Sequence, residues 1–228
     1  AGGRGGVSDP LPEPAREPAA FVREQTSLAS PRLIPEIAIY GATALNPLWH
    51  ASEAELAENG VPPPYWAFAW AGGQAVARYL LDTPAVVAGK RVLDFAAGSG
   101  LCAIAALKAG AAVATASDLD PFACAAMRLN AVANEVTLAV TDADLIDAPA
   151  SYDVVLAGDV FYERAMAERV EPWLKRLARG GAEVLVGDPH RHYLPAHGLE
   201  QRAHYTVPTT RELEDRELCA TSVWRVKG

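Results

Sequence analysis

Short apolar runs alternate with longer, Ala- and Leu-rich stretches through the central part of the chain. Each short run predicts a buried strand; the first ends at Leu93, and the others cover 112–116, 136–140, 152–157 and 182–186. Helices are predicted between them, at 101–110, 121–133 and 165–178. Regular alternation of strands and helices is typical of a doubly wound, mostly parallel sheet with helices on both faces. The predicted fold class is therefore α/β.

The segments before this alternation have different patterns. Residues 1–18 are rich in Gly and Pro, which predicts a flexible tail. Residues 19–65 predict an N-terminal arm. It contains a short amphipathic helix over 19–30, an extended stretch around Ile39 and a second short helix whose N-cap is Ser52.

The main domain is predicted to cover residues 66–228. Its first helix begins near Gly73 and stops before Pro84, because proline does not continue a helix. Two β-prone runs near the end of the chain, 204–210 and 220–226, are joined by a charged segment without a long helix. They predict an antiparallel hairpin that closes one edge of the sheet.

Composition narrows the class of protein. The 228 residues carry a net charge of −8 with a pI near 5.1, which argues against a general nucleic-acid binder. No apolar run reaches the roughly 18 residues that a membrane span needs. The three cysteines, Cys102, Cys124 and Cys219, lack metal-ligand spacing and predict buried free thiols, a reducing compartment and no metal site.

The N-terminal residues bear on the compartment. They show neither the apolar core of a signal peptide nor an amphipathic presequence, which favours the cytoplasm. Since the sequence does not begin with Met, a targeting segment removed earlier would also fit the mitochondrial matrix of a eukaryote.

Carboxylates recur where the predicted strands end. Four of them follow this rule: Asp94, Asp118, Asp142 and Asp159. In open α/β sheets, ligands bind outside the carboxyl ends of the strands. A single such Asp is usually a helix N-cap. Four of them, beside a tight turn that contains Gly98 and Gly100, are better explained by one ligand with several hydroxyl and amine donors.

Two cofactors fit the turn to different degrees. The segment GSGLCA at 98–103 matches the pattern G-x-G-x-x-G/A, and Asp118 lies at the distance expected for a ribose ligand, so NAD is one alternative. However, Asp94 precedes the glycines, where its charge repels a pyrophosphate but receives an ammonium group or water. S-adenosylmethionine has a ribose diol, an adenine amine and an amino-acid moiety, but no phosphate, and therefore suits these residues better.

Several segments carry a family resemblance. RVLDFAAGSG, SDLDP and VTDADL resemble successive motifs of class I S-adenosylmethionine-dependent methyltransferases, which have a Rossmann-like fold. WAGGQA, GDVFY and GDPHR more narrowly resemble the lysine methyltransferases of the electron transfer flavoprotein beta subunit, and the resemblance covers about 21–224. It implies methyl transfer from S-adenosylmethionine to lysines of that subunit, with S-adenosylhomocysteine as product.

Other functions stay open at this point. The acceptor could instead be another protein or a small amine. An NAD-linked oxidoreductase that uses the GSGLCA turn is an alternative from a different class. A third is an interaction protein that binds the cofactor without catalysis.

The expected cofactor site combines the turn, the strand ends and the WAGGQA segment. Asp94 would orient water or the ammonium of the methionyl part, Asp118 would accept from the ribose hydroxyls, and Asp142 would accept from the adenine amine. Asp120 is expected to be a helix N-cap instead. The expected cofactor-binding residues are Trp70, Gly73, Gln74, Asp94, Gly98, Gly100, Asp118, Leu119, Asp142 and Asp159.

The expected catalytic residues are Asp159, Tyr162 and Asp188. A carboxylate stabilises an ammonium group and so opposes its deprotonation, and Asp159 is therefore expected to align the amine rather than act as its base. Tyr162, with Phe161 as either a second wall or a core residue, would tolerate a methylated ammonium by cation–π contact. Asp188 and Arg191 would lie on the substrate side.

One position departs from the resembled pattern. Ala96 stands where the first glycine of the turn is usual. Its methyl group is expected to be tolerable only if φ is negative.

Overall fold

The computed structural model describes residues 17–42, 62–148, 151–210, 214 and 216–228. Most of the predicted flexible tail and the predicted helix after Ser52 lie outside these residues. Within them, every helix is too short or too polar to cross a membrane.

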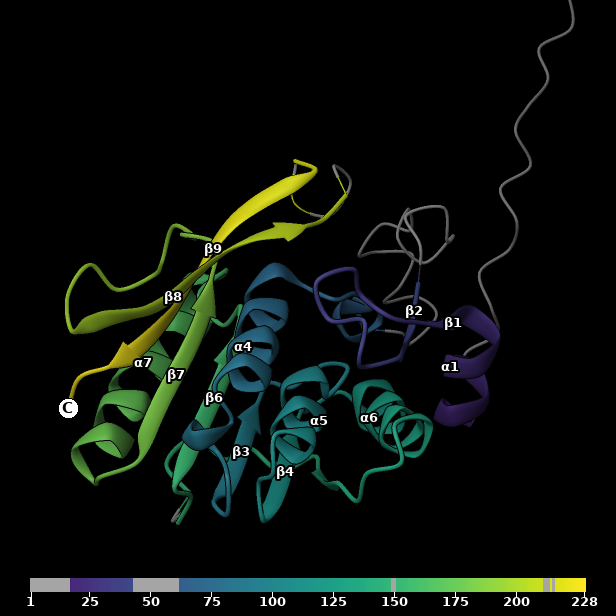
Figure 1. Cartoon of the computed structure of the whole chain (residues 1–228), viewed down its shortest axis with the longest axis horizontal. Coiled ribbons are helices and arrows are strands. Elements are labelled where there is room, and N and C mark those ends of the chain that lie inside the picture. Colours follow the sequence, from purple (N-terminus) through teal and green to yellow (C-terminus); the bar gives the residue numbers. More distant parts are fainter. Residues whose placement is uncertain (1–16, 43–61, 149–150, 211–213, 215) are drawn as a thin grey trace, which may run out of the picture.

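The centre of the fold is a seven-stranded sheet in the order β5-β4-β3-β6-β7-β9-β8 (Figure 1). The first five strands in this order are parallel, and β9 runs antiparallel to both β7 and β8. The predicted fold class and terminal hairpin are confirmed. The strands are β3 (Arg91–Phe95), β4 (Val113–Ser117), β5 (Ala139–Thr141), β6 (Val154–Gly158), β7 (Glu183–Asp188), β8 (Leu199–Pro208) and β9 (Leu218–Val226).

Four α-helices cover the two faces of this sheet. They are α4 (Ala71–Asp82), α5 (Leu101–Lys108), α6 (Pro121–Ala133) and α7 (Arg164–Arg179). Strand residues point alternately to the two faces. Val92 and Leu156 belong to the core under α4 and α5, whereas Leu93 and Val155 pack with Trp173 of α7 on the other face. Both faces are therefore buried, which explains why the parallel strands are almost entirely apolar.

The connectivity of the sheet positions a site. From β3 the chain adds β4 and β5 on one side, and it then crosses over to add β6 and β7 on the other side. The strand order therefore reverses between β3 and β6, and ligands of open α/β sheets bind at such a switch point. Short 3-10 turns, η1 (Tyr65–Ala67) and η2 (Pro84–Val86), precede and follow α4.

The N-terminal arm packs against α6. Phe21 of α1 (Pro18–Gln25) meets Phe122 with 4.8 Å between ring centroids. Asn130 accepts a hydrogen bond from the backbone N–H of Tyr40 at 2.7 Å. Strand β1 (Ser27–Ala29) pairs antiparallel with β2 (Ile39–Gly41). The arm is thus anchored to the main domain by both apolar and polar contacts.

Three predicted boundaries are wrong. Strand β8 begins at Leu199 and not at residue 204. The first helix ends at Gln25 and not near residue 30, because Thr26 turns to extended backbone and the chain enters β1. Strand β5 begins at Ala139 and not at residue 136, because the N–H of Val136 donates back to the carbonyl of Ala131 and closes the end of α6. In the last two places a helix end uses residues whose side chains favour strands.

Candidate active site

A cavity of about 770 Å³ opens at the carboxyl ends of β3, β4 and β6. The start of α4, the turn after β3 and the segment after β5 complete its walls. Most of the predicted site residues lie on these walls. They are Trp70, Gly73, Asp94, Gly98, Asp118, Leu119, Asp159 and Tyr162.

Asp94 receives the amino end of α5. Its side chain is 2% exposed, and Oδ2 accepts a hydrogen bond from the backbone N–H of Ala103 at 2.9 Å. Burial raises the pKa of Asp94 to about 8, and the negative charge of Asp118 contributes. A helix N-terminus is where dinucleotide-binding folds place a pyrophosphate. Here the protein's own carboxylate occupies that position.

The turn after β3 is also closed by internal hydrogen bonds. The N–H of Gly98 donates to Asp118 Oδ2 at 2.9 Å, and the N–H of Gly100 donates to the carbonyl of Ala97 at 2.8 Å. The expectation for Ala96 is wrong, because its φ is +51°. The turn requires left-handed backbone at this residue, and the alanine adopts it at a cost of about 1 kcal/mol.

Asp118 and Asp120 have separate roles. Asp118 accepts from Gly98 and from the N–H of Asp120, and burial raises its pKa. Asp120 is the N-cap of α6 and accepts from Phe122 at 2.8 Å, as predicted. Leu119, between them, is 63% exposed at the rim of the cavity.

The amino end of α4 packs backbone-to-backbone on β6 and β7. A Cβ atom on Gly72 would lie 2.6 Å from Asp159 Oδ2 and against the carbonyl oxygen of Gly187. A Cβ atom on Gly158 would lie 2.8 Å from the Cα of Gly73. The segments WAGGQA, GDVFY and GDPHR each contribute glycine to this contact. Their association in sequence therefore has a steric reason.

Two carboxylates receive the first amides of α4. Asp159 Oδ2 accepts from the N–H of Gly73 at 2.9 Å. Glu214, in the connection between β8 and β9, accepts from the N–H of Ala71. Helix N-termini favour negative charge. Burial nevertheless raises the pKa of both carboxyl groups, which the Arg191 guanidinium partly opposes.

Arg191 joins these two carboxylates. Its Nη2 donates to Asp159 Oδ1 at 2.8 Å and to Glu214 Oε1 at 2.9 Å, and its Nε donates to Asp159 Oδ1 at 3.2 Å. Its guanidinium carbon lies 5.9 Å from the centre of the Trp70 ring, within cation–π range. The side chains of Arg191, Asp159 and Glu214 thus form one largely buried network at the cavity wall.

Comparison with known proteins identifies the family. Residues 78–185 match the model of the ribosomal protein L11 methyltransferase (PrmA) family. The electron transfer flavoprotein beta subunit lysine methyltransferase of Danio rerio is 36% identical over 217 residues, covering 90% of this chain and 81% of that protein. The Homo sapiens protein of the same name is 35% identical over 230 residues, covering 97% and 84%. The chain belongs to the electron transfer flavoprotein beta subunit lysine methyltransferase family.

Solved structures agree on the fold. Magnesium protoporphyrin IX methyltransferase from Synechocystis PCC 6803, solved with bound SAM, has a TM-score of 0.50 and 17% sequence identity, covering 68% of this chain and 78% of that one. The resemblance inferred from the motifs is confirmed, as is the prediction of a methyltransferase enzyme.

Four predicted residues lie away from the cavity surface, although the family assignment holds. Gln74 is 3% exposed and donates from Nε2 to the carbonyl of Ala69. Gly100 caps α5 next to Met127. Asp142 is exposed outside the cavity, and Ala143 and Asp144 line it in its place.

Asp188 is the fourth of these residues. It is fully buried and accepts from the backbone N–H of Arg191 at 2.7 Å. Burial raises its pKa to about 6, and the charge of Asp159 contributes. Phe161 is 1% exposed in the core, whereas Tyr162 lines the cavity with Tyr65 at a 5.8 Å ring separation. Of the two proposed wall residues, only Tyr162 reaches the cavity.

Some site residues were not predicted from sequence. Glu214 lies in the charged segment RELEDREL, where no pattern distinguishes it from its acidic neighbours. Arg169 and Met166 reach the cavity from α7, and Arg169 pairs there with Asp144 at 2.7 Å. Tyr65 has a detectable signal, because it follows three prolines at the start of an aromatic cluster.

Proposed function

We propose that this protein transfers methyl groups from S-adenosylmethionine to lysine side chains of the electron transfer flavoprotein beta subunit. The observation that carries the proposal is the similarity to relatives of that name over 90% or more of this chain, as in the Danio rerio and Homo sapiens proteins. Residues of WAGGQA, GDVFY and GDPHR, the segments that carry the sequence resemblance noted above, meet at the cavity.

The chemistry of the cavity wall supports S-adenosylmethionine over NAD. The N–H groups of Gly98 and Ala103, which a pyrophosphate would need, already donate to Asp118 and Asp94. Five aspartates and two arginines line the described wall: Asp94, Asp118, Asp120, Asp144, Asp159, Arg169 and Arg191. A predominantly acidic wall favours a cationic ligand. S-adenosylmethionine, when bound, supplies a methyl group activated by its positive sulfonium.

We divide the cavity into two sides. The cofactor side comprises Asp94, Gly98 and Asp118, and the substrate side comprises Trp70, Asp159, Tyr162, Arg191 and Glu214. The substrate lysine must lose a proton from a group whose free pKa is about 10.4 before its nitrogen can accept a methyl group. Burial among Trp70 and Tyr162 favours the neutral amine. Asp159 fixes the start of α4 and aligns the amine.

The aromatic walls suit the product as well as the substrate. The rings of Tyr65 and Trp70 lie 6.1 Å apart, next to Tyr162. Such rings attract a methylated ammonium through their faces. Burial raises the pKa of the Tyr162 hydroxyl, which therefore stays protonated at neutral pH.

The N-terminal arm is proposed to form part of the substrate entrance. Pro62, Pro63 and Tyr65, which connect the arm to α4, line the cavity. A protein substrate would approach over them. We place the enzyme where that substrate is found, in the cytoplasm or, in a eukaryote, in the mitochondrial matrix.

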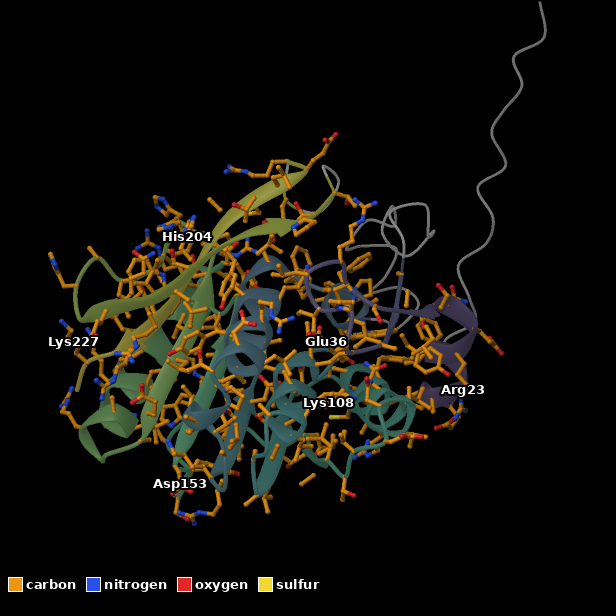
Figure 2. All side chains as sticks on the ribbon, viewed as in Figure 1. Arg23, Glu36, Lys108, Asp153, His204 and Lys227 are labelled. Carbon is orange, nitrogen blue, oxygen red and sulfur yellow. The ribbon has the colours of Figure 1, made fainter. Side chains whose placement is uncertain are left out.

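The proposal is tested by transfer of labelled methyl groups into purified electron transfer flavoprotein beta subunit, with labelled lysines located by mass spectrometry. Asp159→Ala is expected to lower transfer at least about 100-fold while S-adenosylmethionine binding persists in calorimetry. Asp153→Ala is the matched control, because Asp153 pairs with Arg91 at the opposite end of the sheet (Figure 2).

The outcomes separate the parts of the proposal. Label in ribosomal protein L11 alone would replace the proposed substrate. Tight NAD binding without S-adenosylmethionine binding would contradict the cofactor. Loss of S-adenosylmethionine binding in Asp159→Ala would contradict the division into two sides.

A further inference from the structure

The oxygens of Asp159 are already used by the protein. Oδ2 accepts from the N–H of Gly73 and Oδ1 accepts twice from Arg191. Asp159 as a whole residue is 9% exposed, so little of it is accessible to an incoming group. A general base needs an oxygen lone pair directed at the proton it removes. The oxygen lone pairs of Asp159 that could best accept a proton from the substrate are therefore already engaged in hydrogen bonds within the protein.

Among the described residues, Arg191 is the cation that contacts the carboxyl cluster at the start of α4. Three buried carboxylates face it: Asp159 at the end of β6, Asp188 at the end of β7 and Glu214 between β8 and β9. Two thiols also face the cluster, Cys102 from α5 and Cys219 from β9. Burial raises the pKa of each thiol, so both stay neutral. Without Arg191, the partial positive end of α4 would remain to oppose the charge of Asp159.

We propose that Arg191 is a positioning residue that neutralises Asp159, so that the substrate lysine enters as a free amine and not as an ammonium held by a carboxylate. This inference rests on the proposed function. An unpaired carboxylate within 4 to 6 Å of an amine favours the ammonium by about 1 to 3 pKa units. A carboxylate paired with a guanidinium has no such net charge.

The surroundings of Arg191 hold its charge in place. Glu214 accepts from the same Nη2 that donates to Asp159, and the Trp70 ring lies within cation–π distance of the guanidinium. The backbone N–H of Arg191 donates to Asp188, which fixes the turn after β7 independently of the side chain. Replacement of the Arg191 side chain therefore leaves the backbone hydrogen bond of this turn intact.

The test is the pH dependence of kcat for methyl transfer to the protein substrate, which reports the groups of the enzyme–substrate complex, with two variants of opposite sign. Arg191→Gln removes a positive charge, and the pH at which the rate rises is expected to increase by about 1 unit or more. Glu214→Gln removes a negative charge while keeping a hydrogen-bond acceptor for the N–H of Ala71. The pH at which the rate rises is expected to decrease, by a smaller amount. Arg191→Lys keeps the charge and is expected to restore the wild-type position of the rise at a lower rate.

The result that would overturn the inference is a fall in rate with the same pH profile in all three variants, because a purely structural role lowers rate without changing the titration. Shifts of the same sign in Arg191→Gln and Glu214→Gln would also overturn it. Calorimetry with S-adenosylmethionine and thermal unfolding establish that each variant is folded. If the wild-type protein methylates no lysine, the proposed function fails; if it does and the profiles do not move, only the role of Arg191 fails.

Discussion

Helices α4 and α5 both begin at this cavity, and each directs an amide of its first turn at a buried carboxylate from the end of a strand. Helix α5 meets Asp94, and α4 meets Asp159. The hydrogen bond from helix to carboxyl group is the same in both places, but the two sites differ in whether a cationic side chain balances the charge of the carboxylate. Arg191 forms an ion pair with Asp159, whereas no lysine or arginine of the described residues pairs with Asp94. One wall carries a carboxyl group without a paired cationic side chain, and the other carries a carboxylate paired with a guanidinium.

The difference follows the charge of the two ligands. The methyl donor brings a sulfonium and an ammonium group, so a carboxylate without a cation can be compensated by the ligand itself. The acceptor must arrive without its proton, so a carboxylate facing it is better compensated by the protein. The function of a buried carboxylate at a helix N-terminus therefore depends on whether the protein also supplies a cationic side chain that pairs with it.

The largest expected effect comes from closing the space at the start of α4. In Gly72→Ala, the new methyl group would overlap the carbonyl of Gly187 and approach Asp159 Oδ2. We expect a loss of about 3 kcal/mol in the free energy of unfolding. Urea unfolding measures it.

The adjacent glycine provides the control. At Gly73 the nearest atom to an added Cβ is Cys102 Sγ at 3.9 Å, so there is room. Gly73→Ala is expected to be neutral or to stabilise the helix by up to about 1 kcal/mol. Equal losses of unfolding free energy in Gly72→Ala and Gly73→Ala would show that the packing of α4 on the strands has no particular requirement for glycine at position 72.

An effect of similar size and opposite sign is expected when Asp94, the carboxyl group without a paired cation, is replaced by a neutral amide. Its pKa is raised from 3.8 to about 8 in the folded protein. The folded state therefore binds the proton more tightly, and the contribution to stability is complete below about pH 4 and is lost as the pH rises through about 8. In Asp94→Asn this loss disappears, and the variant should gain about 3 kcal/mol relative to wild type between about pH 5 and about pH 8.

Unfolding by urea at several pH values tests this, because other buried carboxylates cancel in the difference between variant and wild type. The same substitution is expected to weaken S-adenosylmethionine binding. A difference that does not vary with pH would mean that Asp94 is already compensated, and the contrast with Asp159 would fail.

The smallest expected effect is at Ala96, in the turn of the cofactor side. Its φ of +51° is strained for any residue with a Cβ atom. Ala96→Gly should raise the free energy of unfolding by about 0.5 to 1 kcal/mol, after the greater chain entropy of glycine is subtracted. Thermal unfolding measures the gain; a lower melting temperature would mean that the methyl group contributes packing that outweighs the strain.

Much of the architecture is predictable from periodicity. Helix α6 begins at Pro121 and ends at Ala133, as predicted, because proline fixes its first turn and Asp120 is an effective N-cap. The apolar runs locate all five parallel strands to within a few residues. Two errors occur where a helix end and a strand compete for the same residues, at Thr26 and Val136, since the local pattern is compatible with both. A third is the start of β8 at Leu199, in a polar stretch that precedes the predicted β-prone run.

The site is less predictable because it depends on long-range partners. The strand-end rule finds Asp94, Asp118 and Asp159, since parallel strands end at one edge of the sheet. It misplaces Asp142, because this first residue after β5 is exposed outside the cavity, and Ala143 and Asp144 line the cavity instead. Glu214 is invisible to this rule, because a connection between antiparallel strands brings it to α4.

The contacts at the start of α4 also affect the order in which the chain folds. Gly73 and Asp159 are separated by 86 positions, whereas Asp94 and Ala103 are separated by nine. During synthesis, the amino-terminal part of a protein is available first. The turn that precedes α5 can therefore form while Arg191 and Glu214 have not yet been made. The wall for the methyl donor can assemble early, and the wall for the lysine is completed only when the last hairpin returns to α4.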